Sequence, residues 1–429
     1  MPKGKRKGRS DRGRNDGSLN SSDDESFDNA SVVSNFSENK DGEEAEDADL
    51  VAQEQLEEKL CEILDGLTQK SSQGRTNCFE NLTKGFVKKY MPNFIRERYF
   101  TICDSIERSL KKGGGPEKMA AAELATIICV QMGGEDACEE ISRNLKPMLL
   151  SIVCDNTVSA PVRAKCCAAL GTMTFLSGGE IGDVIILMQQ FESIYSGSYL
   201  KGDGNVANVS ADTAILHAAA IQAWNLLFTL LSPGNIGTMM NNSKALPTLE
   251  KLSELLESPH LDVRMAAGEA LALVYELGRE ENDDFEEDFA LDITENLKHL
   301  ATDSHKYRAK KDRKQQRATF RDILQFFEND IVPELSIKFG RETLVLDSWS
   351  RRKQYETLCN VLGPSINVHL TDNDLLRDIF EIILPPQMAE MPAHQQHQME
   401  RYRKRLVNAA NFKARTLSRA RNRDKRSDF

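Results

Sequence analysis

The sequence predicts an all-α protein, an armadillo/HEAT-like helical solenoid with a small α+β C-terminal cap, a terminal basic helix and a disordered N-terminus. Two observations carry this prediction. The 429 residues are 40% apolar, their apolar runs are rich in alanine, and alternating β-branched stretches are scarce, which favours helices. One helical pattern also recurs along the middle of the chain, between strongly charged ends. An irregular helical bundle is the alternative to a solenoid.

Residues 1–52 are the predicted disordered segment. Residues 1–14 contain seven Lys or Arg, residues 15–37 are rich in Ser, Asn and Asp, and residues 38–58 contain ten Asp or Glu. Such a composition cannot bury enough apolar surface to offset the entropy that the chain loses on ordering. We therefore expect the folded part to begin at about residue 53.

The solenoid is predicted over residues 53–330. Four stretches repeat one pattern, small residues followed by large apolar ones and then by Gly or Pro, and they start near residues 117, 161, 214 and 262. A period of about 40–50 residues is typical of solenoids built from helix pairs. Small Ala and Gly side chains let adjacent helices approach closely, while Leu and Ile fill the space between layers.

Residues 331–386 are predicted to form the cap. Two short runs, LSIKF and ETLVLD, have the length and composition of strands, and two helical patterns, SRRKQYETLCNVLG and DNDLLRDIFEII, follow them. The prolines of LPPQMAEMP then interrupt the chain. We expect this small α+β unit to close the solenoid.

Residues 387–429 are predicted to hold the terminal basic helix. From Arg401 to Phe429 there are 11 Lys or Arg and two Asp, whereas the whole chain has a net charge of −11. The apolar stripe of this segment is thin, so an isolated helix would be marginal and should fold against phosphate. Its candidate nucleic-acid-binding residues are Arg401, Arg403, Lys404, Arg405, Phe412, Lys413, Arg415, Arg419, Arg421, Arg423, Lys425 and Arg426.

A second basic block, HKYRAKKDRKQQRATFRDIL, precedes the cap. From Lys306 to Arg321 it contains eight Lys or Arg against one Asp. On a helix these cations form rows at i, i+4 and i+8, in which like charges repel one another. A merely solvated face usually mixes both signs, so this face indicates contact with a polyanion. The candidate binding residues are Lys306, Arg308, Lys310, Lys311, Arg313, Lys314, Arg317 and Arg321.

Nucleic acid is the polyanion that these two blocks favour. Eight of the 11 cations in the tail are Arg, whose planar fork suits phosphate, and a membrane-binding helix would need a bulky apolar face that this one lacks. An Arg-rich segment that folds on binding fits RNA better than DNA. A nuclear-import signal is an alternative use of the same basic clusters.

Nothing in the sequence points to catalysis, a cofactor or a metal. The chain lacks a phosphate-binding loop, a nucleophile elbow and an HExxH motif, and the pair His394 and His397 is better explained as a solvated helix start. Nine Cys without a CxxC pair favour reduced, buried thiols in the cytosol or nucleus. The most apolar stretch, AILHAAAIQAWNLLFTLLSPG, contains His217, Gln222 and Asn225, so we expect a buried core helix. The sequence therefore predicts no enzyme, no small-molecule substrate and no membrane partner.

Six stretches of the chain are similar to a known family. They are DSIERSLKKG, VRMAAGEALALVYELGR, LATDSHKYRAKKDRKQQRATFRDIL, IKFGRETLVLDSW, NDLLRDIF and NAANFKARTLSRARNRDKRSD, and they extend over most of residues 55–429. In these stretches the chain resembles the interferon-related developmental regulator family, to which the two basic blocks are specific. The first 50 residues match the family only in character.

The resemblance implies two functions, neither of them enzymatic. One is a factor that binds ribosomes and rRNA and represses translation, with the C-terminal helix lying in the mRNA path. The other is a transcriptional co-regulator in differentiation, which binds co-repressor proteins of the histone-deacetylase type through the solenoid. The resemblance also implies both a cytoplasmic and a nuclear location. A 29-residue Arg-rich element exceeds what nuclear import requires, which favours the first function.

Overall fold

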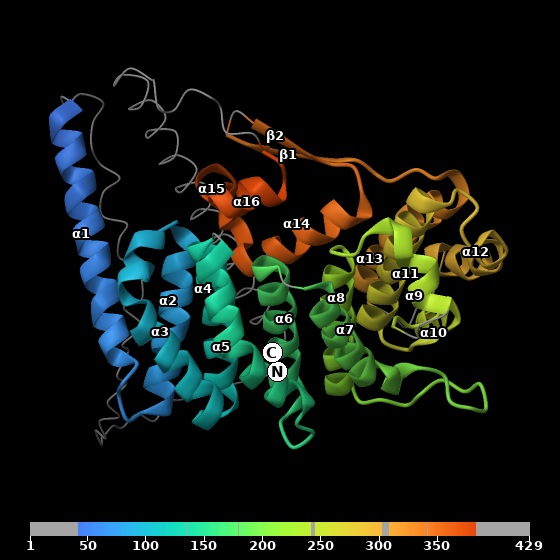
Figure 1. Cartoon of the computed structure of the whole chain (residues 1–429), viewed down its shortest axis with the longest axis horizontal. Helices are drawn as coiled ribbons and strands as arrows, with labels where there is room; N and C mark the ends of the chain where they lie inside the picture. The colour runs from blue at the N-terminus through green and yellow to red at the C-terminus, as the bar shows by residue number, and fades with distance from the viewer. Residues whose placement is uncertain are drawn as a thin grey trace, which may run out of the picture. The chain divides into compact units, whose positions relative to one another are not determined.

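The computed structural model describes residues 42–133, 135–178, 180–241, 245–302, 309–340 and 342–382. Helices dominate these residues, and six of them form a central row in which each packs against the next (Figure 1). The prediction of an all-α solenoid is therefore confirmed. The helices of the central row are α2 (Ser72–Lys88), α4 (Gly115–Met132), α6 (Ala160–Ser177), α8 (Ala211–Phe228), α11 (Leu261–Glu281) and α13 (Lys310–Asn329).

A second set of helices packs on the central row and forms an outer row. In most repeats one long helix takes this place, so that α3 packs on α4, α5 on α6, α7 on α8 and α12 on α13. Between α8 and α11 two short helices, α9 and α10, take it instead. The outer helices are α3 (Pro92–Lys112), α5 (Glu135–Cys154), α7 (Ile181–Tyr195), α9 (Ile236–Asn241), α10 (Leu249–Glu254) and α12 (Glu287–Thr302).

The four repeated sequence patterns are four consecutive members of the central row, α4, α6, α8 and α11. Their small residues have the role that the sequence predicts. A Cβ atom on Gly171 of α6 would lie 2.8 Å from the Cβ of Ala223 in α8. A Cβ on Gly268 of α11 would lie 2.9 Å from the side chains of Phe320 and Ile323 in α13. Glycine thus sets how closely these neighbouring helices approach.

The first helix, α1 (Gly42–Gly66), begins about ten residues before the predicted boundary. The acidic composition of residues 42–52 predicts that they belong to the disordered segment. Acidic side chains at a helix N-terminus interact favourably with the helix dipole, and Glu, Ala and Leu are strong helix formers. The acidic stretch therefore starts a helix, which corrects that part of the prediction. Residues 1–41 lie outside the described residues.

The predicted strands and helices of the cap are present. Strands β1 (Leu335–Phe339) and β2 (Glu342–Leu346) pair antiparallel, with Leu335 opposite Leu346. Three helices follow, α14 (Trp349–Leu362), α15 (Ile366–Asp372) and α16 (Asp374–Ile379). We call the described residues from β1 to residue 382 the hairpin–helix segment.

The hairpin–helix segment lies across the central row instead of covering only its last helix. Helix α14 packs on α2, α4, α8 and α11 (Figure 1, orange). His369 Nε2 lies 3.0 Å from the carbonyl oxygen of Val87, and Asn373 Nδ2 donates to Val130 at 2.7 Å. Both carbonyls belong to the last turns of α2 and α4, which have no partner within their own helix. The segment therefore bonds to helix ends of the first repeats as well as packing near the last.

The remaining expectations concern the apolar stretch and the thiols. The most apolar stretch forms α8, whose side chains are mostly buried, and no helix among the described residues is long and apolar enough to cross a membrane. All nine Cys are free thiols. Four of them are buried and four are half-buried, but Cys154 is exposed, so the prediction of buried thiols is wrong for that residue.

Candidate nucleic-acid interface

Helix α13 carries most of the first basic block. Six of its eight candidate residues, Lys310, Lys311, Arg313, Lys314, Arg317 and Arg321, lie between the first residue of α13 and its middle. Lys306 and Arg308 lie outside the described residues. The structure therefore places six of the predicted cations on one half of a single helix.

Four of these cations form a continuous stripe, which we call the α13 stripe: Lys310, Lys314, Arg317 and Arg321. Their spacing of four, three and four residues puts them on one side of a helix. Lys310, Lys314 and Arg321 are exposed, and Arg317 is half-buried. Away from the stripe, α13 is buried against α11 and α12 and other parts of the core through Gln316, Phe320, Ile323, Phe326 and Phe327. Burial of this apolar side fixes the direction in which the stripe points.

The described part of the protein does not neutralise the cations of α13. In the part of the chain that the structure describes, none of the six makes an ion pair with a carboxylate, and Arg317 Nε donates to the backbone oxygen of Arg313 at 3.2 Å. Many other exposed cations have such a partner. Lys111, for example, pairs with Glu107, and Arg143 pairs with Glu139.

The position of these cations on the helix is also unfavourable for stability. The N-terminus of a helix carries a partial positive charge, so a cation in the first turn costs about 0.3–1 kcal/mol. Lys310 and Lys311 are in that turn, Asp312 is the acid there, and the N-cap residue Ala309 provides no side-chain hydrogen bond. An external phosphate would reverse this repulsion, because helix N-termini attract anions.

An acidic turn lies near the other end of α13. Tyr275 of α11 donates to the backbone oxygen of Glu286 at 3.1 Å, and its ring packs against that of Phe327 in a tilted arrangement, with centroids 4.6 Å apart. The exposed turn Asn282–Glu286 is therefore close to the C-terminal half of α13. The helix has 20 residues and is about 30 Å long, which separates its basic N-terminal end from this acidic turn. The surroundings of its two ends therefore differ in charge. Such a gradient orients a polyanion toward the basic end.

The second basic block lies entirely outside the described residues. This applies to the twelve candidate residues from Arg401 to Arg426, and to His394 and His397. Their role as binding residues stays a prediction from the sequence.

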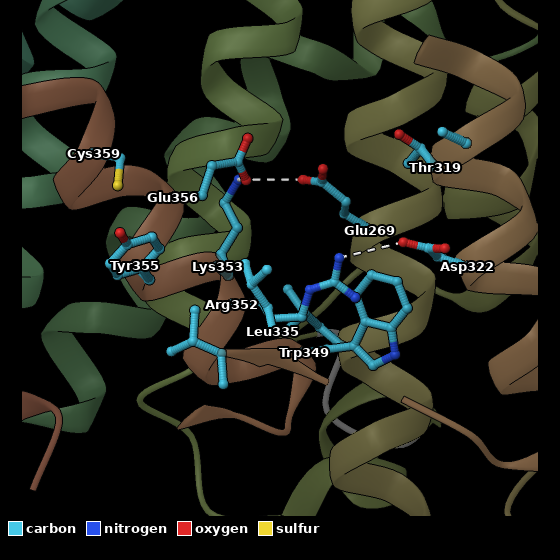
Figure 2. Close-up of a pocket in the computed structure, with 13 residues that line it drawn as sticks. Glu269, Thr319, Asp322, Leu335, Trp349, Arg352, Lys353, Tyr355, Glu356 and Cys359 are labelled. Carbon is cyan, nitrogen blue, oxygen red and sulfur yellow. Dashed lines mark hydrogen bonds and ion pairs between the residues drawn. The ribbon is translucent and has the colours of Figure 1, made fainter. Parts of the chain in front are cut away.

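A pocket of about 410 Å³ lies on the side of α13 that faces the hairpin–helix segment (Figure 2). Helices α11, α13 and α14 and both strands contribute to it. Trp349 and Tyr355 form aromatic walls, and Cys359 lies at one edge. The charged residues of its lining are Glu269, Asp322, Arg352, Lys353 and Glu356.

Both cations of this pocket are paired with carboxylates of its lining. Lys353 is 5% exposed, and its Nζ lies 3.2 Å from both Glu269 and Glu356 (Figure 2). Burial opposes the charge of Lys353, but attraction to the two carboxylates is stronger, and its pKa is raised. Burial likewise raises the pKa of Glu269, and Lys353 opposes that change. Arg352 pairs with Asp322 at 3.3 Å. The arrangement resembles an interhelical junction more than a site with a free reactive group.

Further polar contacts attach the hairpin–helix segment, and sequence reasoning missed them. Glu276 of α11 accepts the backbone N–H groups of Trp349 and Ser350, the latter at 2.8 Å, and so caps the N-terminus of α14. Arg377 donates to both oxygens of Glu342 at 2.9 and 3.0 Å. One signal was available, because Glu269 and Glu276 interrupt the small and apolar residues of α11 and a carboxylate in such a place needs a partner.

Within the described residues no group of His, Cys, Asp and Glu side chains has the arrangement of a metal site. The α13 stripe remains the clearest candidate for a binding surface, and its contact with phosphate stays a prediction. Its geometry suits any polyanion, so comparison with known proteins is needed to narrow the function.

Two family models match the chain. The model described as "Interferon-related developmental regulator" matches residues 29–328, and the one described as "Interferon-related protein conserved region" matches residues 373–427. The second match includes the basic tail.

Individual relatives match over most of their length. The chain is 40% identical over 381 residues to interferon-related developmental regulator 2 of Mus musculus, an alignment that covers 88% of this chain and 84% of the relative. It is 37% identical to interferon-related developmental regulator 1 of Homo sapiens, with 88% and 82% covered. These relatives are named as regulators, not as enzymes. With both family models and these alignments in agreement, the chain belongs to the interferon-related developmental regulator family.

Proposed function

We propose that this protein is a non-enzymatic regulator that binds ribosomal RNA on the ribosome and represses translation. The observation that carries the proposal is the α13 stripe, four cations without a carboxylate partner among the described residues, the first of which, Lys310, lies in the first turn of the helix, where a cation is destabilising. Selection for stability alone would favour Glu or Asp at Lys310 and Lys311. An rRNA backbone supplies the missing negative charge.

The rigidity of the stripe supports a structured partner. Five buried residues of α13 anchor the helix in the core, and the neighbouring Arg264 of α11 donates to Gln316 of α13 at 2.7 Å. A fixed row of cations loses little conformational entropy when it binds a fixed row of phosphates. Folded rRNA presents such rows, whereas a flexible polyanion would have to be ordered first.

The basic tail is the second element of the proposal. Residues 401–429 carry a net charge of +9. As a helix they would extend about 43 Å at 1.5 Å per residue, enough to occupy a channel meant for mRNA. We propose that the α13 stripe holds the protein on rRNA while the tail blocks the mRNA path. The two elements then have separable effects.

Ribosome sedimentation tests both parts. The wild-type chain, a chain ending at Pro392 and the variant K310Q/K314Q/R317Q/R321Q are added to ribosomes, and binding and translation are measured. We expect the stripe variant to bind weakly. The truncated chain should bind better than the stripe variant but repress little. Equal binding and equal repression by all three proteins would overturn the proposal.

A matched control separates this effect from net charge. The variant K111Q/R143Q/K165Q also removes exposed cations, but each of these has a carboxylate partner in the protein. It should bind ribosomes nearly as the wild type does. RNase treatment of the ribosomes should abolish co-sedimentation of the wild type.

Salt dependence gives a second readout. Binding of a protein that neutralises phosphates weakens as salt rises, with a logarithmic slope of about 0.7 for each phosphate of a single strand. Loss of the four stripe cations should therefore reduce the slope by up to about 3. An unchanged slope would mean that the stripe does not contact phosphate.

The second candidate is a transcriptional co-regulator scaffold that holds co-repressor proteins in the solenoid. The arrangement of the hairpin–helix segment does not favour it, because α14 already lies against α2, α4, α8 and α11. Both candidates predict a cytoplasmic and nuclear distribution. A pull-down that recovers histone-deacetylase-type proteins equally from wild type and stripe variant, without ribosomes, would support the scaffold instead.

A further inference from the structure

A second pocket of about 410 Å³ lies in the middle repeats, where α5 ends and α6 and α8 begin. None of its lining residues belongs to α13. Its rim contains the exposed residues Cys154, Asn156 and Ser193, and its floor contains the buried residues Leu216 and His217. Ala160, Arg163, Gln190, Ile194 and Thr213 complete the lining.

The lining has an unusual charge for this protein. Although the chain has a net charge of −11, the pocket is lined by one cation, Arg163, and by no carboxylate. Three acids are adjacent in sequence to lining residues, Asp155, Glu192 and Asp212, and the carboxylate of Asp155 accepts hydrogen bonds from the backbone N–H and the hydroxyl of Thr157. The pocket is therefore suited to an anion.

Arg163 is held in place, and its charge acts on the carboxylate of Asp155 without forming an ion pair within the described residues. Its Nε donates to the backbone oxygen of Val153 at 2.8 Å, which fixes the plane of the guanidinium. Among the described residues, its two terminal nitrogens have neither a hydrogen-bond partner nor an ion-pair partner. A guanidinium in this state offers a planar pair of donors, the arrangement that binds phosphate through two parallel hydrogen bonds.

The backbone also contributes positive electrostatic potential to the pocket. Helices α6 and α8 have 18 residues each, and their first turns contribute Ala160, Arg163 and Thr213 to the lining. At the N-terminus of α6, Pro161 has no N–H group, and the N–H groups of Val162 and Arg163 donate to the backbone oxygen of Ser159 at 3.1 Å. The helix dipole still favours an anion at this end.

His217 gives an independent indication of a ligand. Its side chain is buried at 5% exposure, and its Nδ1 lies 2.6 Å from the hydroxyl of Ser198. No described residue pairs with its Nε2. When Ser198 donates to Nδ1, Nε2 carries the proton and becomes a buried donor for an occupant of the pocket. Burial, together with the positive charge of Arg163, lowers the pKa of His217 to about 4, so the ring is neutral at pH 7.

We propose that this pocket binds a small phosphate monoester, with Arg163 donating hydrogen bonds to the phosphate and His217 donating a further one. A volume of about 410 Å³ is within the range of small-molecule sites and far larger than phosphate needs, so the ligand carries an organic group. The amides of Asn156 and Gln190 at the rim suit the hydroxyl or ring atoms of a sugar or base. This site is separate from the proposed rRNA contact and does not depend on it.

Calorimetric titration of the full chain tests the proposal. The probes are adenosine 5′-monophosphate, ribose 5-phosphate, inorganic phosphate and adenosine. We expect the two esters to bind, inorganic phosphate to bind more weakly and adenosine not to bind. Binding of the nucleotide alone identifies a nucleotide site, whereas binding of both esters identifies a sugar-phosphate site. If neither ester binds to the folded wild type, the proposal is wrong.

Three variants check the residues. R163Q removes the guanidinium, and Q190E adds a carboxylate while keeping the bond between Arg163 and Val153. Each should weaken ester binding at least about tenfold. K165Q is the matched control, because Lys165 lies on the same helix but is exposed and paired with Glu123. Unchanged affinity in both R163Q and Q190E would overturn the assignment. The α13 stripe variant should bind the ester normally, so that failure of the rRNA proposal is distinguishable from failure of this one.

Discussion

The cations of the hairpin–helix segment and those of α13 are close in sequence but have opposite environments. Lys353 and Arg377 are 5% and 3% exposed, and each is within hydrogen-bond distance of a carboxylate from another element. The α13 stripe is mostly exposed and has no carboxylate partner among the described residues. The first set connects parts of the protein, while the second is available to another molecule.

This difference shows that charge counts alone do not reveal a binding surface. A cation is useful for recognition when the fold has left it without a partner, and Lys353 fails this test although it lies in a basic helix. We therefore expect that removing a cation of the first set destabilises the protein, whereas removing a cation of the second set leaves its stability unchanged or raises it.

The largest effect is expected for Lys353→Met. The substitution leaves Glu269 and Glu356 facing each other in a partly buried site, and breaking a buried ion pair costs about 3–5 kcal/mol. The measurement is the midpoint of urea unfolding, followed by circular dichroism. The double variant E269L/K353M should recover most of the loss, since an apolar pair can replace a buried ion pair. A loss below about 1 kcal/mol in the single variant would contradict the assigned role.

His369 should give the next largest effect, through pH. Burial lowers its pKa to about 4, below the ordinary value of about 6.5 that it has in the unfolded chain. Between these two values the unfolded chain binds a proton that the folded chain does not, so stability falls as pH decreases. From pH 7 to pH 5 this residue alone should cost about 2 kcal/mol.

Urea unfolding at both pH values, for the wild type and His369→Gln, measures that contribution by difference. The variant should lose less stability on acidification. The variant should keep the loss of stability on acidification that is due to His217, whose pKa is also lowered to about 4 by burial. Identical pH dependence in the two proteins would show that the bond from His369 to Val87 does not hold the segment in its neutral form.

The smallest effect has the opposite sign and concerns Lys310→Glu. An acid in the first turn of α13 interacts favourably with the helix dipole, so the free energy of unfolding should rise by about 0.3–1 kcal/mol while rRNA binding weakens. Lys111→Glu is the control, because Lys111 lies in the last turn of α3 and pairs with Glu107. This control should lose a few tenths of a kcal/mol. A stability loss in Lys310→Glu would mean that the stripe has an internal partner.

Local patterns were sufficient for much of the fold. Alanine and glycine at helical spacing, as in VRMAAGEALALVYELGR, identified α4, α6, α8 and α11, because close packing needs small residues whatever the neighbour is. The runs LSIKF and ETLVLD became the two strands. The sequence also located the basic face of α13, since its apolar anchor and its cations lie on one helix and need no distant information.

Long-range contacts were not accessible in the same way. The sequence indicated a cap that closes the solenoid, whereas His369 bonds to Val87 and Asn373 to Val130 in the first repeats. Nothing within a helical turn of these residues specifies such partners. The start of α1 was misplaced for a related reason, because acidic composition suggested disorder where it stabilises a helix N-terminus.

The amino-acid sequence by itself determined which segments are helices, which of them are small-residue helices of the central row, and where positive charge accumulates. Only the tertiary structure decided which charges are paired, that of Lys353 with Glu269, and which have no ion-pair partner among the described residues, such as that of Lys310. The physical reason is the separation in sequence between the residues that interact. Helix formation depends on residues three or four positions apart, whereas the partner of a buried charge can lie 84 residues away, as Glu269 does from Lys353.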